Sequence, residues 1–326
     1  MKGLQTILGI NGVIGEGLAH ELIQRGYPVR GVSRGGFTGA WEHRSADALN
    51  KSQLLEAVKG SEVVYVCLGL VYNIKVWQRD WPIVMGNVIE VCLETGAKLV
   101  FLDNVYMYGK VDGVMTEETP NHPSSEKGKV RAVIADMLME AIEKKGLKGC
   151  IARAADFYGP KNNHSVLNDT VFVPFSKGKK ANWLGRDDVK HAYTYTEDIF
   201  KALATLGLDE RANGQIWHLP TDFNALTGKE LIEMIAKEME VLPRYQKIGN
   251  FMLRLLGLFM PIMREMPEMM YQYNSEYIFD SSKYDTVFGD MKATSYEEGI
   301  RKTAQFYLRT KDEGRIHKSE VIGHRL

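Results

Sequence analysis

Short apolar runs alternate with longer amphipathic stretches through the first half of the chain. Five runs have the length and apolar content of buried strands, at residues 4–8, 29–32, 63–68, 98–102 and 149–153. Apolar residues recur at helical spacing in four other stretches, at residues 14–25, 54–58, 83–95 and 130–144. This order predicts βαβ units. We therefore expect an α/β fold, with a Rossmann-type doubly wound parallel sheet covered by helices on both faces.

The alternation is lost after Gly159 and Pro160, where loops, Met-rich segments and an amphipathic helix at 228–241 follow. We expect residues 1–160, joined again by 191–220, to form the sheet domain. Residues 161–190 and 221–326 are expected to form a smaller C-terminal domain that contacts the substrate, since pockets often lie at such a junction.

The most apolar later segment is NFMLRLLGLFMPIM at residues 250–263, which is 14 residues long and contains Arg254. It falls short of the roughly 20 apolar residues that a membrane-spanning helix requires. We predict a buried or pocket-covering helix here, and an interfacial or partner-binding helix is the alternative.

Composition narrows the class of partner. The chain has 326 residues, 41 of them Lys or Arg and 41 Asp or Glu, with a pI of about 7.1. No overall field would attract nucleic acid or an anionic membrane, so we expect neither and favour a small molecule. Cys67, Cys92 and Cys150 fit no metal pattern, and the first residues carry no signal-peptide pattern. We interpret the cysteines as core thiols of a cytoplasmic protein.

The first chemical motif is GINGVIG at residues 9–15, between the first predicted strand and the first predicted helix. In such a motif the first glycine permits a tight turn, the second lets a pyrophosphate approach the backbone, and the third allows close helix packing. The helix N-terminus faces the negative charge. The motif predicts a dinucleotide site formed by Gly9, Asn11, Gly12, Val13, Ile14 and Gly15.

The end of the second predicted strand indicates which dinucleotide binds. A site for NAD usually has Asp or Glu there, to hold the ribose 2′-hydroxyl, whereas this chain has Ser33 and Arg34. A hydroxyl and a guanidinium suit a 2′-phosphate, so we favour NADP(H) over NAD(H). The alternative for Arg34 is a solvated loop charge.

Further motifs follow in order along the chain: RSADAL with Asp47, CLG with Leu68 and Gly69, MGNVIEVC with Asn87, FLDNVYMYG at 101–109, RAADFYGP at 153–160 and HAYTYTEDIFKAL at 191–203. With the glycine motif they make residues 4–220 resemble an extended short-chain dehydrogenase/reductase of the NAD-dependent epimerase/dehydratase family. The resemblance implies that Asp47 lies beside the adenine and that Leu68 and Gly69 lie along the cofactor. It also implies that Asn87 is the Asn of the family's central helix.

The chain departs from the family where the chemistry is done. The family uses a Ser or Thr and a Tyr/Lys pair four residues apart. The alignment places Asn104 at the first position, and Lys127 and Arg131 at the pair. This resembles the atypical members of the superfamily.

Several side chains could replace the missing tyrosine. An unperturbed lysine has a pKa of about 10.4, so Lys127 is better suited to donating a proton during a reduction than to acting as a base. Alternatively, Lys127 and Arg131 hold the ribose and phosphates, or form a solvated helix face. Tyr106 and Tyr108 are further proton donors, or else packed aromatic residues, and Asn104 could donate a hydrogen bond to a substrate oxygen.

Substrate contacts are expected from the later motifs. Asp156 is one candidate, although it could instead be a structural carboxylate that caps a loop. Asn162 and Asn163, in the polar loop KNNHS, are others. His164 and His191 lack metal-ligand spacing, so we predict no metal and treat both as substrate-loop or surface histidines.

Two functions fit these observations. The first is an NADP(H)-dependent oxidoreductase or epimerase-like enzyme acting on a small polar substrate that is sugar-derived or bears a carbonyl group. The second is a catalytically silent NADP(H)-binding protein with a regulatory or partner-binding role. The resemblance also implies a possible homodimer, because family members commonly pair through the helices equivalent to 83–95 and 130–144.

Overall fold

The computed structural model describes residues 2–36, 39, 41–162, 165–289 and 291–312. Its centre is a seven-stranded sheet in which all neighbouring strands are parallel. The spatial order is β12 (Ile216–His218), β7 (Gly149–Arg153), β5 (Lys98–Asp103), β4 (Ser61–Val66), β1 (Leu4–Leu8), β2 (Val29–Ser33) and β3 (Glu42–Ser45). The chain winds outward in both directions from β1 and β4, as in a Rossmann sheet. The predicted fold class is confirmed.

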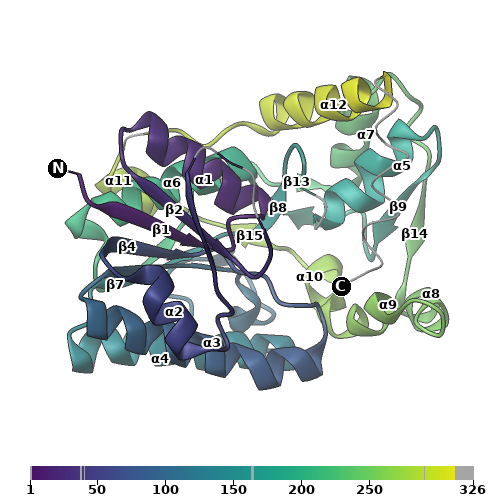
Figure 1. The fold of residues 1–326 in the computed structure, drawn as a ribbon. Helices are drawn as coiled ribbons and strands as arrows, with labels where there is room; N and C mark the ends of the chain where they lie inside the picture. Colours follow the sequence, from purple (N-terminus) through teal and green to yellow (C-terminus); the bar gives the residue numbers. More distant parts are fainter. Residues whose placement is uncertain (1, 37–38, 40, 163–164, 290, 313–326) are drawn as a thin grey trace.

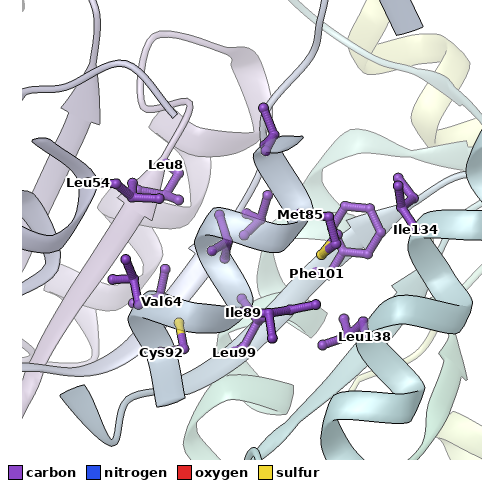
Figure 2. Packing of buried hydrophobic residues seen from close by; sticks show 14 of the residues in the cluster. Leu8, Leu54, Val64, Met85, Ile89, Cys92, Leu99, Phe101, Ile134 and Leu138 are labelled. Atoms are coloured by element: carbon purple, nitrogen blue, oxygen red, sulfur yellow. The ribbon is translucent and has the colours of Figure 1, made fainter. Parts of the chain in front are cut away.

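Helices cover both faces of the sheet (Figure 1). One face packs against α2 (Lys51–Val58), α3 (Ile74–Thr95) and α4 (Glu126–Lys145), and the other against α1 (Val13–Gln24), α6 (Thr196–Leu208) and α11 (Ser282–Val287). Figure 2 shows the first of these interfaces, where strand and helix side chains meet: Leu8, Val64, Leu99, Phe101, Met85, Ile89, Ile134 and Leu138.

The predicted start of α3 was wrong, for a reason visible in its sequence. Pro82 suggests a helix that begins just after it, since proline lacks the N–H of an interior hydrogen bond. In the structure α3 begins at Ile74, because the side chain of Asn73 accepts hydrogen bonds from the N–H groups of Lys75 and Val76. The helix then continues through Pro82.

The remaining strands form two-stranded ladders that extend the molecule beyond the main sheet. These are β8 (Asp156–Tyr158) with β11 (Tyr193–Tyr195), β10 (Lys190–His191) with β13 (Leu226–Thr227), β9 (Ala181–Leu184) with β14 (Tyr245–Ile248), and β6 (Val114–Met115) with β15 (Ile278–Phe279). The helices of this part are α5 (Val173–Ser176), α7 (Gly228–Glu238), α8 (Asn250–Leu256), α9 (Pro261–Glu265), α10 (Met270–Asn274) and α12 (Tyr296–Asp312). Short helical turns lie at η1 (Tyr106–Tyr108), η2 (Asn168–Phe172), η3 (Glu210–Ala212) and η4 (Pro267–Met269).

Part of the expected substrate domain joins a core of the main sheet. α11, which lies in the expected substrate domain, packs against the main sheet through the buried Tyr284. The division of the chain into two domains therefore stays a prediction.

The apolar segment at 250–263 is not one buried helix. It divides into α8 and α9, since the chain turns at Gly257 and Pro261 opens the second helix. Leu253 is buried in α8, but most other apolar side chains of the segment are exposed. Within the described ranges, none of the helices combines the length and apolar character that a bilayer crossing requires.

Candidate cofactor and active site

The glycine-rich turn has the shape that a dinucleotide needs. Gly9 has φ +90°, and a Cβ there would lie 2.6 Å from the Cys67 carbonyl oxygen. A Cβ on Gly15 would lie 2.4 Å from the Gly9 carbonyl oxygen, whereas one on Gly12 would meet only that oxygen, at 3.4 Å. Gly12 is the N-cap of α1, and because it has no side chain it caps none of the helix N–H groups. The first turn of α1 therefore leaves backbone N–H groups for a pyrophosphate, and a dinucleotide fits.

The end of β2 carries polar and cationic groups. The Ser33 hydroxyl donates to the Gly35 carbonyl at 2.9 Å and lies 2.9 Å from His43 Nε2 on β3. Arg34 is exposed and forms no ion pair with any described residue. It is therefore available to a phosphate.

The other expected cofactor residues lie around this edge. The Asp47 carboxylate accepts the N–H of Leu49, and the Asn87 amide donates to the Ala48 carbonyl at 2.9 Å, so α3 holds the Asp47 loop. Leu68 is half-buried and Gly69 is exposed, directly after β4. Because the first turn of the glycine motif contacts Cys67, this loop lies beside it.

Lys127 is fully buried at the start of α4, at 0% exposure. Its Nζ donates to Glu265 Oε2 at 2.5 Å and to Glu268 Oε1 at 2.6 Å, and it lies 4.7 Å from the centre of the Tyr72 ring. The two glutamates come from α9 and η4, far along the chain. The expected solvated face at Lys127 is therefore wrong, because partners from a distant segment enclose it.

Arg131 lies one turn further along α4 and is also buried. Its Nε donates to Asp103 Oδ1 at 2.7 Å, and its guanidinium also donates to the same oxygen through a terminal nitrogen. The guanidinium lies 4.6 Å from the Trp81 ring and 5.0 Å from the Phe101 ring. Both its charge and its flat faces are thus engaged by the protein.

Asn104 and Tyr106 follow β5 directly. Asn104 Oδ1 accepts the Tyr106 N–H at 3.0 Å, and among the described residues its amide nitrogen donates to no protein acceptor. Burial raises the pKa of Tyr106 well above its usual range, and the nearby Tyr72 and Asp156 add to the rise. Tyr106 is therefore protonated at neutral pH.

Tyr108 faces a different part of the core. Its hydroxyl lies 2.8 Å from His218 Nε2, and the other ring nitrogen of His218 lies 2.7 Å from the Asp280 carbonyl oxygen. The Arg153 guanidinium lies 4.7 Å from the Tyr108 ring. Its surroundings favour the packed-aromatic alternative over proton donation.

Asp156 and His191 meet although they are far apart in the sequence. His191 Nε2 lies 3.0 Å from Asp156 Oδ2, and the Tyr273 hydroxyl donates to the same oxygen at 3.1 Å. His191 is 1% exposed and stacks between the rings of Tyr273 and Tyr277, so the expected surface location for it is wrong. Its position follows from the parallel pairing of β8 with β11, which sets Tyr193, two residues after His191, opposite Asp156.

Six tyrosines lie within electrostatic reach of Asp156, and we call them the tyrosine cluster. Burial raises the pKa of each one, and the Asp156 carboxylate adds to each rise. The cluster comprises Tyr72, Tyr106, Tyr193, Tyr271, Tyr273 and Tyr277. A site lined in this way holds several protonated phenols.

A model of the NAD dependent epimerase/dehydratase family matches residues 6–219. This chain belongs to that family. Family membership agrees with the glycine turn, the strand order and the resemblance carried by the motifs.

Individual relatives are more distant. The "3beta-hydroxysteroid-dehydrogenase/decarboxylase isoform 2" of Arabidopsis thaliana is 23% identical over 323 residues, covering 88% of this chain and 56% of that protein. This chain thus spans about half the length of that relative. UDP-glucose 4-epimerase of Thermus thermophilus, solved with NAD, has a TM-score of 0.77 at 18% identity, covering 93% of this chain and 98% of its own. dTDP-glucose 4,6-dehydratase of Bacillus anthracis, also solved with NAD, has a TM-score of 0.78 at 16% identity, covering 95% and 98%. The two structures share the fold of this chain.

Sequence reasoning missed the residues that the C-terminal part brings to this family site. Glu265 and Glu268 enclose Lys127, and Tyr271, Tyr273 and Tyr277 line the surroundings of Asp156. The aromatic-rich stretch MYQYNSEY at 270–277 was a usable signal.

Three further expectations have simple outcomes. Asn162 is buried, while Asn163 and His164 lie outside the described residues. The three cysteines are free, with Cys92 and Cys150 buried and Cys67 half-buried. In the described part of the chain, no group of three or more His, Cys, Asp or Glu side chains could hold a metal ion.

Proposed function

We propose that this chain is an NADP(H)-dependent reductase of a small, polar, carbonyl-bearing substrate. The observation that carries the proposal is the meeting, at one edge of the sheet, of a dinucleotide turn with a cluster of protonated tyrosines. The carboxyl ends of β1, β4 and β5 adjoin there, at the switch point where ligands of such sheets bind.

The cofactor preference is supported by the end of β2. No carboxylate follows Ser33, and Arg34 has no ion pair among the described residues. A guanidinium bound to a 2′-phosphate contributes about 1.5–3 kcal/mol, or roughly tenfold to a hundredfold in affinity. NADPH should therefore bind more tightly than NADH, and Arg34→Asp should reverse or abolish the preference. Equal affinities of the parent protein in calorimetry would contradict this assignment.

The direction of reaction is supported by the protonation state of the site. A bound nicotinamide supplies the hydride, so the chain itself must supply a proton to the carbonyl oxygen. Burial raises the pKa of Tyr106, which keeps the phenol protonated but also makes it a weaker acid, so its proposed donor role rests on its position just after β5 and not on the pKa. Asn104 lies two residues before it, with its amide N–H groups available to bind the same oxygen.

Lys127 is a second candidate for the proton donor, although two carboxylates hold it. Asp156 and His191 would then position the substrate. The names of the compared proteins, a hydroxysteroid dehydrogenase/decarboxylase and two sugar-nucleotide enzymes, support a ketone or secondary alcohol as the reacting group. We further propose that residues 1–160 and 191–220 hold the cofactor, while residues 161–190 and 221–326 cover the substrate.

The test is turnover of NADPH across a panel of ketones, sugar-derived ketones and enones. Tyr106→Phe should lower kcat by about a hundredfold, the usual range for a lost general acid, with NADPH affinity unchanged. Tyr108→Phe is the matched control and should keep kcat within about threefold, since that hydroxyl faces His218. Full activity of Tyr106→Phe with loss in Lys127→Met would transfer the donor role to Lys127. Tight NADPH binding without turnover of any compound would favour the silent binding protein.

A further inference from the structure

The surface of α8, α9 and their connecting turn carries a concentrated set of exposed apolar side chains. Phe251 is 82% exposed and Phe259 is 81% exposed. Five other large apolar residues in the same short stretch are also exposed. We call the seven residues the apolar patch: Phe251, Met252, Leu255, Leu258, Phe259, Met260 and Ile262. Exposed apolar residues gathered in this way mark an interaction surface.

The patch is a built surface and not a loosened part of the core. Phe251 and Leu255 have i, i+4 spacing in α8, so they share one face of that helix. The opposite face places Leu253, at 0% exposure, in a separate core with Ile248. Arg264 closes the turn, because its guanidinium donates to the carbonyls of Gly257 and Leu258.

The charge of the segment indicates what kind of partner it fits. Residues 250–264 contain Arg254 and Arg264 and no Asp or Glu, and the carboxylate of Glu265, the last residue of α9, is paired with Lys127. Arg254 is exposed and has no ion pair with any described residue. Phenylalanine and leucine beside unpaired arginine complement an anionic lipid surface. In a symmetric pair of copies the same patch would bring like charges together, which disfavours self-association.

The patch is also held close to the candidate active site. At the end of α9, Glu265 accepts hydrogen bonds from the Ile74 N–H at 3.1 Å and from Lys127, and in η4 Glu268 accepts from the Glu126 N–H at 2.8 Å. These contacts tie the segment to the N-termini of α3 and α4. A surface that rested on the patch would therefore lie beside the carboxyl edge of the sheet.

We propose that the apolar patch docks this protein onto the surface of an anionic lipid bilayer, with the phenylalanines inserted and Arg254 at the headgroups. Insertion at the boundary of headgroups and acyl chains is about 5–10 Å deep, so no spanning helix is required. Since the chain has no net charge, adhesion rests on this patch and not on an overall field.

The experiment is sedimentation of the full chain with vesicles of phosphatidylcholine alone or mixed with phosphatidylglycerol, without cofactor or substrate. The parent should bind the mixed vesicles. Phe251→Ser/Phe259→Ser should lower the partition coefficient by about tenfold or more. Arg254→Gln should lower it by roughly fivefold on the mixed vesicles, with little change on the neutral ones. The matched control is Phe223→Ser/Leu242→Ser, which removes two residues of 60% and 65% exposure outside the patch and should bind like the parent.

Several results would overturn the proposal. One is a parent protein that stays in the supernatant. Another is an equal loss of vesicle binding in the patch variant and in the control. A third is vesicle binding that changes neither with Arg254→Gln nor with the content of anionic lipid. A dimer in light scattering that the patch variant abolishes, with no vesicle binding by the parent, would assign the patch to a second copy instead. Because binding is read without turnover, these outcomes do not depend on the proposed reductase activity.

Discussion

Replacing Lys127 by methionine should destabilise the protein strongly, because it leaves two carboxylates together without their cation. At an effective dielectric constant of about 20, each contact of roughly 2.6 Å represents about 6 kcal/mol of gross attraction. Desolvation of three charged groups offsets most of this in the intact protein. Removing one partner of a buried pair typically costs about 3–5 kcal/mol. The side chains of Glu265 and Glu268 are 11% and 25% exposed, so some water reaches them, and we expect about 2–4 kcal/mol.

Chemical denaturation of a mutant cycle measures this energy. The cycle comprises the parent, Lys127→Met, Glu265→Gln/Glu268→Gln and the triple variant. The triple variant should be about 1–3 kcal/mol more stable than Lys127→Met, since it buries no unpaired charge. Lys129→Met is the control, because Lys129 forms a pair of the same 2.5 Å length with Glu126, but with side chains 60% and 51% exposed. Its effect should stay within about 0.5 kcal/mol.

An interaction energy below about 0.5 kcal/mol in the cycle would refute the reasoning, since it would mean that the three charges are hydrated. The cycle also separates structure from chemistry. If Lys127 donates the proton, Lys127→Met and the triple variant should both lose about a hundredfold in turnover. If Lys127 only anchors α9 and η4, the triple variant should recover the activity of Glu265→Gln/Glu268→Gln.

Further predictions concern the cofactor turn, pH and assembly. Gly12→Ala should lower dinucleotide affinity while the free energy of unfolding stays within about 1 kcal/mol of the parent. Gly15→Ala should lower both, because its Cβ would lie 2.4 Å from a backbone oxygen. Calorimetry measures the affinity and chemical denaturation measures the stability. Burial lowers the pKa of His218 to about 3, so the folded protein keeps this ring neutral. The free energy of unfolding that depends on the neutral ring is fully present above pH 6.5 and is lost as the pH falls toward 3. Between pH 6.5 and 4.5 the free energy of unfolding, measured by chemical denaturation, should fall by about 2–3 kcal/mol more in the parent than in His218→Phe. Equal losses would contradict the assignment. Light scattering should detect a homodimer through α3 and α4, where Ile83 is 46% and Val133 50% exposed; a monomer at tens of micromolar would remove this prediction.

The main sheet was predictable because its elements are local. The strand at 149–153 was predicted with its observed ends. The motif also predicted correctly that Gly9 and Gly15 leave no room for a side chain, since a Cβ at either one would meet nearby backbone. β3 and β12 were missed. β3 carries the polar sequence EHRS at the sheet edge, and β12 is three residues long, so neither produces a buried apolar run.

The candidate site was predictable only in part. Asp156 and His191 were both singled out, and the structure brings them together through the pairing of β8 with β11. Glu265 and Glu268 could not be found by pattern, because a carboxylate that pairs with Lys127 over such a distance in sequence leaves no periodic signal. The preferred prediction for 250–263, a buried or pocket-covering helix, was wrong for a related reason, since an apolar run carries no mark of what covers it.

The protonation states and partners of the side chains at the site limit the reactions that it can support. Burial raises the pKa values of the tyrosine cluster, so at neutral pH its members are protonated and are weak acids. Lys127 is occupied by two carboxylates, and Asp156 already accepts from Tyr273 and faces His191. In the proposed reaction, oxidation of an alcohol would require a base to be freed from these contacts, whereas reduction of a carbonyl would use the proton that Tyr106 already carries. The contacts of Lys127 with Glu265 and Glu268 also hold the apolar patch in place, so movement of α9 and η4 would change both the surroundings of Lys127 and the exposed surface.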